Sequence, residues 1–321
     1  MTNVTRVSAH VSTSAPAAVS APDAAAPAAA ARARSGVFAA SVCYLLWGAF
    51  PIYWKQLKVL APTELIAHRS VWTCVVVIAL VAAQRRFGEV RAALATAGGF
   101  ARNALGAALL TANWLVYVWG VNHDRVLETS LGYFLVPLAN VAAGRFLLGE
   151  HLRRTQWLAI ACAATGVTLM IFRLGHPPWI ALALAGTWGG YSLLRKRSQL
   201  PALTGLTVET LLVAPFALAF LLWSYRAGLG AYGQLSAAKH LYLAASGIIT
   251  AVPLVLFAYG AQRLRLTTLG LLQYLAPSVQ FLLGVALYHE PFARTDAIHF
   301  AFIWIALALY TVDNLWAQRK K

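Results

Sequence analysis

Ionisable residues are scarce in this sequence, and acidic residues are the scarcest. Only 11% of the 321 residues are charged, with 10 Asp and Glu against 26 Lys and Arg, whereas 60% are hydrophobic. Soluble domains carry about 25% charged residues, and a chain this apolar lacks the polar surface that keeps a protein in water. The composition therefore predicts a membrane protein.

The excess of basic residues does not indicate a nucleic-acid-binding protein. The formal net charge is +16, but the Lys and Arg residues are scattered between apolar segments and do not form the single patch that nucleic-acid binding requires. We expect them to flank membrane spans, and we expect no nucleic-acid partner.

Cysteine is almost absent, and so are the common motifs of catalysis. The three cysteines, Cys43, Cys74 and Cys162, lie far apart in apolar stretches, which supports neither a disulfide framework nor a zinc site. The sequence has no GxxxxGK[ST] loop for ATP, no HExxH metal motif and no GxSxG nucleophile motif. We therefore expect no catalytic residue, no metal and no cofactor, and neither an enzyme nor an ATP-driven pump.

Long apolar segments are abundant. A helix needs about 20 mostly apolar residues to cross the hydrocarbon core of a bilayer. Ten segments meet this requirement, and they begin near Gly36, Glu64, Ala104, Thr129, Thr155, Pro178, Gly205, Leu241, Thr267 and Ile298. We expect an all-α integral membrane protein with ten transmembrane helices. Residues 1–35, rich in Ala, Pro, Ser and Thr, are expected to form a disordered cytoplasmic tail.

The distribution of basic residues predicts the orientation, because Lys and Arg concentrate in short cytoplasmic loops. If the N-terminus is cytoplasmic, the inner loops hold twice as many Lys and Arg residues as the outer loops. We therefore expect both termini in the cytoplasm. Arg195, Lys196 and Arg197 are interpreted as topology determinants at that face.

The second half of the chain repeats features of the first half about 140 positions later. The recurring residues are Pro137, Gly144, Glu150, Arg154 and Thr155, matched by Pro277, Gly284, Glu290, Arg294 and Thr295. We expect one five-helix repeat over residues 36–174 and a second over residues 175–317, before a basic cytoplasmic C-terminus at 318–321. An odd number of helices inverts the second copy, which gives the inverted-repeat plan of secondary transporters. Glu150 and Glu290 would then end equivalent helices at opposite membrane faces, and we interpret both as structural helix-end residues.

Polar residues at membrane depth are site candidates by default. Glu64 and His68 are four residues apart, on one helix face, and Arg69 follows. This cluster fits either an anionic or zwitterionic solute, a proton relay, or a structural ion pair at the outer end of the helix. We assign Glu64 and His68 to the solute site and Arg69 to the ion pair.

A second cluster combines aromatic rings with hydrogen-bonding groups, the usual lining of a small-molecule pocket. Its members are Asn113, Tyr117, Asn122, Glu128 and Tyr133. The alternative is an aromatic belt at the outer interface, which we prefer for the adjoining residues 123–125.

In the second half, Glu209, Gln273 and Tyr274 are the candidates within spans, and Trp47 and Trp188 are equivalent tryptophans of the two repeats. The two tryptophans are expected either to stack on solute or to pack helices together. A lone buried glutamate is suited to coupling transport to protons. Glu64 and Glu209 are therefore our proton-coupling candidates.

Several stretches resemble the RarD-type permeases of the EamA family, within the drug/metabolite transporter superfamily. They include YLLWGAFPIYWK, ELIAHRSVW, NWLVYVWGVNHDRVLETSLGYFLVPLANV, FLLGEHLRRTQWLA and RLRLTTLGLLQYLAP. The resemblance implies two inverted five-helix EamA-type repeats and a solute permease of the bacterial cytoplasmic membrane, but no defined binding site.

We therefore expect a secondary transporter that moves a metabolite, amino acid or drug by alternating access, in export or exchange. Its partners would be the solute and the lipid bilayer, and it would be a monomer or homodimer. The alternative is a membrane receptor or assembly protein with no transport cycle.

Overall fold

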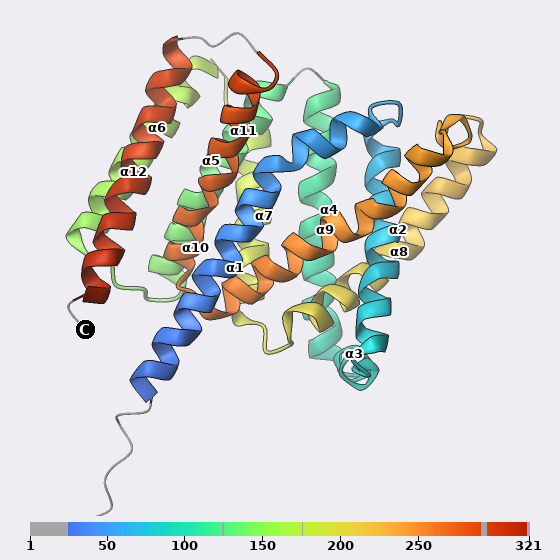
Figure 1. Ribbon diagram of the computed structural model, residues 1–321, viewed down its shortest axis with the longest axis horizontal. Helices are drawn as coiled ribbons and strands as arrows, with labels where there is room; N and C mark the ends of the chain where they lie inside the picture. Colours follow the sequence, from blue (N-terminus) through green and yellow to red (C-terminus); the bar gives the residue numbers. More distant parts are fainter. Residues whose placement is uncertain (1–24, 124, 175, 290–293, 320–321) are drawn as a thin grey trace, which may run out of the picture.

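Long helices make up the regular structure of the residues that the computed structural model describes, which are 25–123, 125–174, 176–289 and 294–319. No strand occurs among them (Figure 1). The helices are α1 (Ala25–Trp54), α2 (Pro62–Ala83), α3 (Phe87–Ala95), α4 (Ala97–Asn122), α5 (Val126–Ala142), α6 (Arg154–Leu174), α7 (Trp179–Arg197), α8 (Ala202–Arg226), α9 (Ala237–Arg263), α10 (Leu266–Gln273), α11 (Leu275–Ala286) and α12 (Arg294–Arg319). Short helical turns follow at Lys55–Leu57, Ala143–Leu147 and Tyr232–Gln234.

Among the described residues, eight helical segments are long and apolar enough to cross a membrane. They are Ala28–Leu57, Pro62–Ala83, Ala97–Val121, Glu128–Leu147, Arg154–Phe172, Ala202–Arg226, Ala237–Arg263 and Leu266–Ala286. Helix α12 adds a shorter apolar segment, Ala301–Asp313. Helix α7 is not in this set, and its last turn holds three basic residues. The protein is therefore a helical, multi-span membrane protein, and the expected total of ten spans stays a prediction.

Helix α1 corrects the expected extent of the N-terminal tail. It begins at Ala25 and not near Gly36, so residues 25–35 are helical. Alanine, which dominates this stretch, has the highest helix propensity, and Pro27 falls in the first turn, where a proline costs no internal hydrogen bond. Residues 28–34 are exposed, and Figure 1 shows this part of α1 projecting beyond the other helices. Residues 1–24 lie outside the described residues.

The helices form a bundle in which partners distant in sequence lie side by side. Helix α1 packs on α9 and α11, α2 on α8 and α9, and α7 on α4 and α5. Helices α6 and α12 pair at one edge of the bundle, and α2 and α8 lie at the opposite edge (Figure 1). The largest buried cluster lies between α1, α7 and α9 and includes Tyr44, Trp188, Tyr191 and Phe257.

Two glycines let helices approach closely. A side chain at Gly270 of α10 would meet the Pro137 carbonyl oxygen of α5 at 2.8 Å, and one at Gly247 of α9 would collide with the backbone of Trp72 in α2. Small residues at such crossings are the usual means by which membrane helices pack. The Gly247 contact holds α9 against α2, a helix that lines the cavity described below.

Candidate solute site

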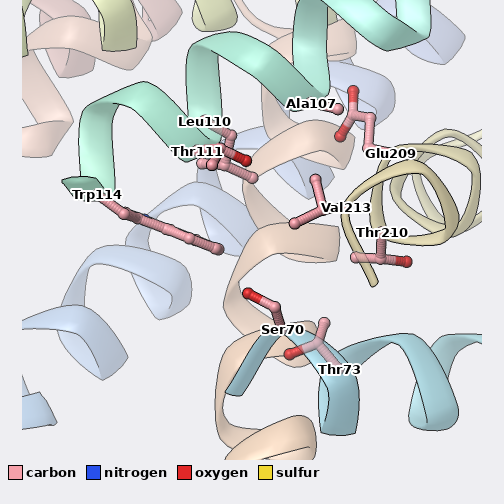
Figure 2. Close-up of a pocket in the computed structure, with 9 residues that line it drawn as sticks. All are labelled: Ser70, Thr73, Ala107, Leu110, Thr111, Trp114, Glu209, Thr210 and Val213. Carbon is pink, nitrogen blue, oxygen red and sulfur yellow. The ribbon is translucent and has the colours of Figure 1, made fainter. Parts of the chain in front are cut away.

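A cavity lies between α2, α4 and α8, and Figure 2 shows side chains from the three helices around it. In this conformation it is narrow and partly open to its surroundings, with room for about one water molecule. The lining combines hydroxyl groups, apolar side chains, one indole and one carboxylate, from Ser70, Thr73, Ala107, Leu110, Thr111, Trp114, Glu209, Thr210 and Val213. Apolar walls with a few polar groups are typical of a small-molecule site.

Three hydroxyl groups of this cavity donate hydrogen bonds to the backbone of their own helices. Ser70, Thr73 and Thr210 each donate to a carbonyl oxygen one turn earlier in their own helix, at 2.8, 2.6 and 2.9 Å respectively. A hydroxyl that donates in this way keeps oxygen lone pairs available. These three hydroxyl donors are therefore satisfied within their own helices.

Glu209 reaches the cavity, but it is not the lone carboxylate that the sequence suggested. Its Oε1 accepts from Nη1 of Arg195 at 3.3 Å, and its Oε2 accepts from the Tyr191 hydroxyl at 3.0 Å. The guanidinium also donates to the Ala202 carbonyl oxygen at 3.2 Å. Arg195 is 1% exposed, so its interpretation as a surface topology determinant is wrong.

Helix spacing and one glycine explain why Arg195 is buried against Glu209. Arg195 follows Tyr191 by four residues, so both side chains lie on the inner face of α7. Gly205 precedes Glu209 by four residues on α8, and a Cβ atom at Gly205 would collide with the Arg195 guanidinium. These two spacings are the signals that could have predicted the buried pair.

Glu64 and His68 lie outside the cavity lining and contact the connection between α8 and α9. The Glu64 carboxylate accepts from the backbone N–H of Ala231 at 3.1 Å, and Nε2 of His68 lies 3.9 Å from Glu64 Oε1. The His68 ring stacks on Tyr232 with a centroid distance of 4.9 Å. These contacts are those of an anchor for the loop, and a binding role for the two residues stays a prediction.

Arg69 does not make the expected ion pair with an acidic side chain of the described residues. Residues five apart on a helix point about 140° away from each other, so Arg69 faces away from Glu64. Its guanidinium carbon lies 3.9 Å from the centroid of Trp114 and 5.6 Å from that of Trp54. Nε and Nη2 are buried and have no hydrogen-bond partner. The absence of an acid three or four residues away on α2 was the missed signal.

The second predicted cluster divides into separate contacts. Asn113 donates to the Leu184 carbonyl and to the Thr187 hydroxyl, both at 3.0 Å, which ties α4 to α7. Glu128 accepts from the backbone N–H of Ile180 at 2.8 Å and so caps the start of α7. These two side chains therefore hold helix α7.

The aromatic members of that cluster do lie together. Tyr117 and Tyr133 meet edge to face at 5.6 Å, and both hydroxyls lie within electrostatic range of Arg69. The side chain of Asn122 lies outside the described residues.

The remaining candidates pack at the centre of the bundle. The rings of Trp47 and Trp188 meet at 5.1 Å, and both contact Phe257. Gln273 accepts from Asn140 at 3.2 Å, and the Tyr274 hydroxyl donates to the Phe134 carbonyl oxygen at 3.2 Å. None of the four predicted residues lines the cavity.

Glu150 has the surroundings of a helix-end residue. Its carboxylate accepts from the backbone N–H groups of Leu266 and Thr267, at 2.6 and 3.0 Å, and from the Thr267 hydroxyl at 2.5 Å. A carboxylate at a helix N-terminus satisfies free N–H groups and complements the helix dipole. Glu150 thus caps α10, a helix of the other half. Glu290 lies outside the described residues.

A multi-span helical membrane protein with a partly polar cavity is the class that this fold and cavity define. The family model of the EamA-like transporter family matches residues 34–172 and 178–312. The chain belongs to this family, and it is a multi-pass transporter of the bacterial inner membrane.

Relatives and a solved structure agree with this assignment. The chain is 40% identical over 288 residues to "Protein RarD" of Salmonella typhi, covering 90% of this chain and 98% of the relative. It is also 40% identical over 296 residues to "Uncharacterized transporter YojE" of Bacillus subtilis, covering 91% and 98%. A solved crystal structure aligns with a TM-score of 0.68 at 22% identity, covering 87% of this chain and 98% of that one, which supports the fold alone.

Proposed function

We propose that the protein is a secondary transporter that moves a small organic solute by alternating access, in export or exchange. The observation that carries this proposal is the cavity, because its walls come from both predicted halves of the chain. Helices α2 and α4 belong to residues 36–174, and α8 belongs to residues 175–317. Solute sites at the interface of two repeats are typical of secondary transporters.

The contacts between helices support an inverted repeat of two five-helix units. Under a two-fold relation, α1 against α9 should be mirrored by α7 against α4, and α1 against α11 by α7 against α5. All four contacts occur. Residues near a two-fold axis should also meet their own equivalents. The Trp47 and Trp188 rings do so, and the Tyr274 hydroxyl bonds the carbonyl of Phe134, 140 positions earlier.

Glu209 remains our candidate for proton coupling. Its carboxylate lies between the cavity and Arg195, so a proton taken up by Glu209 would weaken its hold on the guanidinium. We propose that protonation of Glu209, with the weakened contact to Arg195, couples proton movement to solute transport. We also propose that both termini lie in the cytoplasm. Glu64, which holds the α8–α9 loop, is the second candidate.

Cysteine labelling tests alternating access without knowledge of the solute. In a variant lacking Cys43, Cys74 and Cys162, single cysteines replace Thr111 or Thr210 in the cavity, or Leu218, which is 49% exposed on α8, as the control. A membrane-impermeant maleimide is applied to right-side-out or inverted vesicles. We expect the cavity cysteines to react from either side, in proportions that change when a proton gradient is imposed.

The competing function is a receptor or assembly protein with no transport cycle. Labelling of both cavity positions from one side only, unaffected by the gradient, would favour it. Metabolite profiles of cells with and without the gene, inside and outside, would then identify the transported solute.

A further inference from the structure

We propose that Arg69 is the anchor of an anion site, which binds the carboxylate of an organic anion against the rings of Trp54 and Trp114. This inference deepens the proposed function, on which it rests, by naming the chemical class of the solute. The site borders the cavity, because the Trp114 ring that contacts the guanidinium also lines the cavity.

The positive charge of Arg69 has no acidic partner among the described residues. Every acidic side chain that the structure describes is engaged elsewhere. Glu64 holds the N–H of Ala231, and Glu209 holds Arg195. The remaining pairs are Glu89 with Arg86, Glu128 with Arg125, Glu150 with Arg265, and Asp313 with Arg153. A guanidinium within a membrane span is costly and is normally paired, so Arg69 requires an anion from outside this set.

Two hydrogen-bond donors of Arg69 have no acceptor among the described residues. The two buried nitrogen atoms without partners are Nε and Nη2. Their N–H bonds are parallel on one edge of the guanidinium, and that edge matches the two oxygens of a carboxylate. The same two atoms of Arg86 hold the oxygens of Glu89, each at 2.9 Å. Arg69 thus has the edge that Arg86 uses, buried beside the tryptophan rings and without a hydrogen-bond acceptor among the described residues.

The aromatic rings around Arg69 indicate what the rest of the ligand, beyond its carboxylate, should be. The guanidinium contacts the Trp114 ring at 3.9 Å and lies nearer to it than to Trp54. Tyr117 and Tyr133 meet edge to face and lie near enough to interact electrostatically with Arg69. Such rings exclude water around a carboxylate and pack well on an apolar group. An organic monoanion with an apolar body therefore fits better than a small inorganic anion.

A phospholipid headgroup offers similar anionic oxygens, so the experiment must separate a solute from a lipid. The full chain is placed in nanodiscs of phosphatidylcholine alone, and the binding of benzoate, phenylacetate and indole-3-acetate is measured by titration calorimetry, with benzamide as the uncharged control. We expect at least one carboxylate to bind, benzamide not to compete, and Arg69→Gln to weaken binding at least tenfold. Arg69→Lys should retain part of the affinity, because a lysine keeps the charge but loses the paired donors.

Arg102→Gln is the matched control, because Arg102 is an exposed arginine of α4. It should bind as the wild type does. Unchanged binding in Arg69→Gln, or no binding of any of the three anions to the wild type, would overturn the proposal. So would native mass spectra in which phosphatidylglycerol stays on the wild type but not on Arg69→Gln, together with no carboxylate binding.

The two proposals fail separately. Alternating access of the cavity cysteines without Arg69-dependent anion binding would leave the transporter and remove the anion site. Anion binding that depends on Arg69, without alternating access, would leave a binding site on a protein that does not transport.

Discussion

Two arginines lie inside this helical bundle with opposite surroundings. Arg195 of α7 is fully enclosed, and its charge meets Glu209 on the next helix. Arg69 of α2 lies against tryptophan rings, and two of its nitrogen atoms have no partner. The same side chain therefore has two roles. Arg195, the paired arginine, joins helices α7 and α8 in the second half of the chain. Arg69, the unpaired arginine, is the residue that we propose binds an anion beside the cavity.

Removing the paired arginine should have the largest effect. Arg195→Met leaves the buried Glu209 carboxylate without its cation, and losing one partner of a buried pair costs about 3–5 kcal/mol. We expect a strongly lowered midpoint of thermal unfolding in detergent. The double variant with Glu209→Gln should recover part of the loss, since no buried charge then remains. An unchanged midpoint in Arg195→Met would remove the contrast between the two arginines.

Blocking the space of the paired arginine should have the next largest effect. In Gly205→Ala the new methyl group would meet the Arg195 guanidinium, and overpacking of this kind costs about 1–3 kcal/mol. Gly186→Ala on α7 is the control, because no atom lies within 4 Å of its new methyl group. Thermal unfolding of the two variants measures the difference, and equal midpoints would show that Arg195 can move at no cost.

Removing the unpaired arginine should barely change stability. Arg69→Gln loses the contact with Trp114, but it also relieves an unpaired charge within the membrane, and the two effects oppose each other. We expect the free energy of unfolding to change by less than about 1 kcal/mol, although anion binding is lost. A loss as large as that of Arg195→Met would mean that Arg69 is a structural residue.

The sequence predicts the parts of this fold that depend on local composition. Runs of about 20 apolar residues identify the helices, and the carboxylate of Glu150 lies at the start of α10. The helical start of α1 is missed because residues 25–35, which are mostly alanine, follow a stretch rich in Pro, Ser and Thr and are assigned to the same tail. The helix that Glu150 caps is not predictable locally, because α10 is 116 positions away.

The candidate site is predicted less well, because it depends on which way each side chain turns. Three consecutive basic residues end α7, yet Arg195 is buried and Arg197 is exposed. Asn113 and Glu128 have the right chemistry for a pocket but bond to α7 instead. Only contacts between segments distant in sequence decide these cases. Of the predicted site residues, Glu209 alone is in the cavity lining.

A third arginine, at the water boundary, gives the smallest predicted effect and sharpens the comparison. Arg86, before the short helix α3, donates two hydrogen bonds to Glu89, and the Thr204 hydroxyl donates a third at 2.7 Å. These bonds hold the pKa of Glu89 below its ordinary value. The pair's stabilisation is therefore present at neutral pH and is lost as the pH falls through that lowered pKa.

The magnitude should be small, because the Glu89 side chain is 40% exposed and water and salt screen the charges. We expect Glu89→Gln to lower stability by about 0.2–1 kcal/mol at pH 7 and low salt, and the difference from the wild type to shrink on acidification or on addition of salt. Unfolding of both proteins across pH measures this. Each pair joins one arginine to one carboxylate, so a small loss in Glu89→Gln and a large loss in Arg195→Met would assign the difference to burial. Equal losses would mean that burial does not determine how much such a pair contributes.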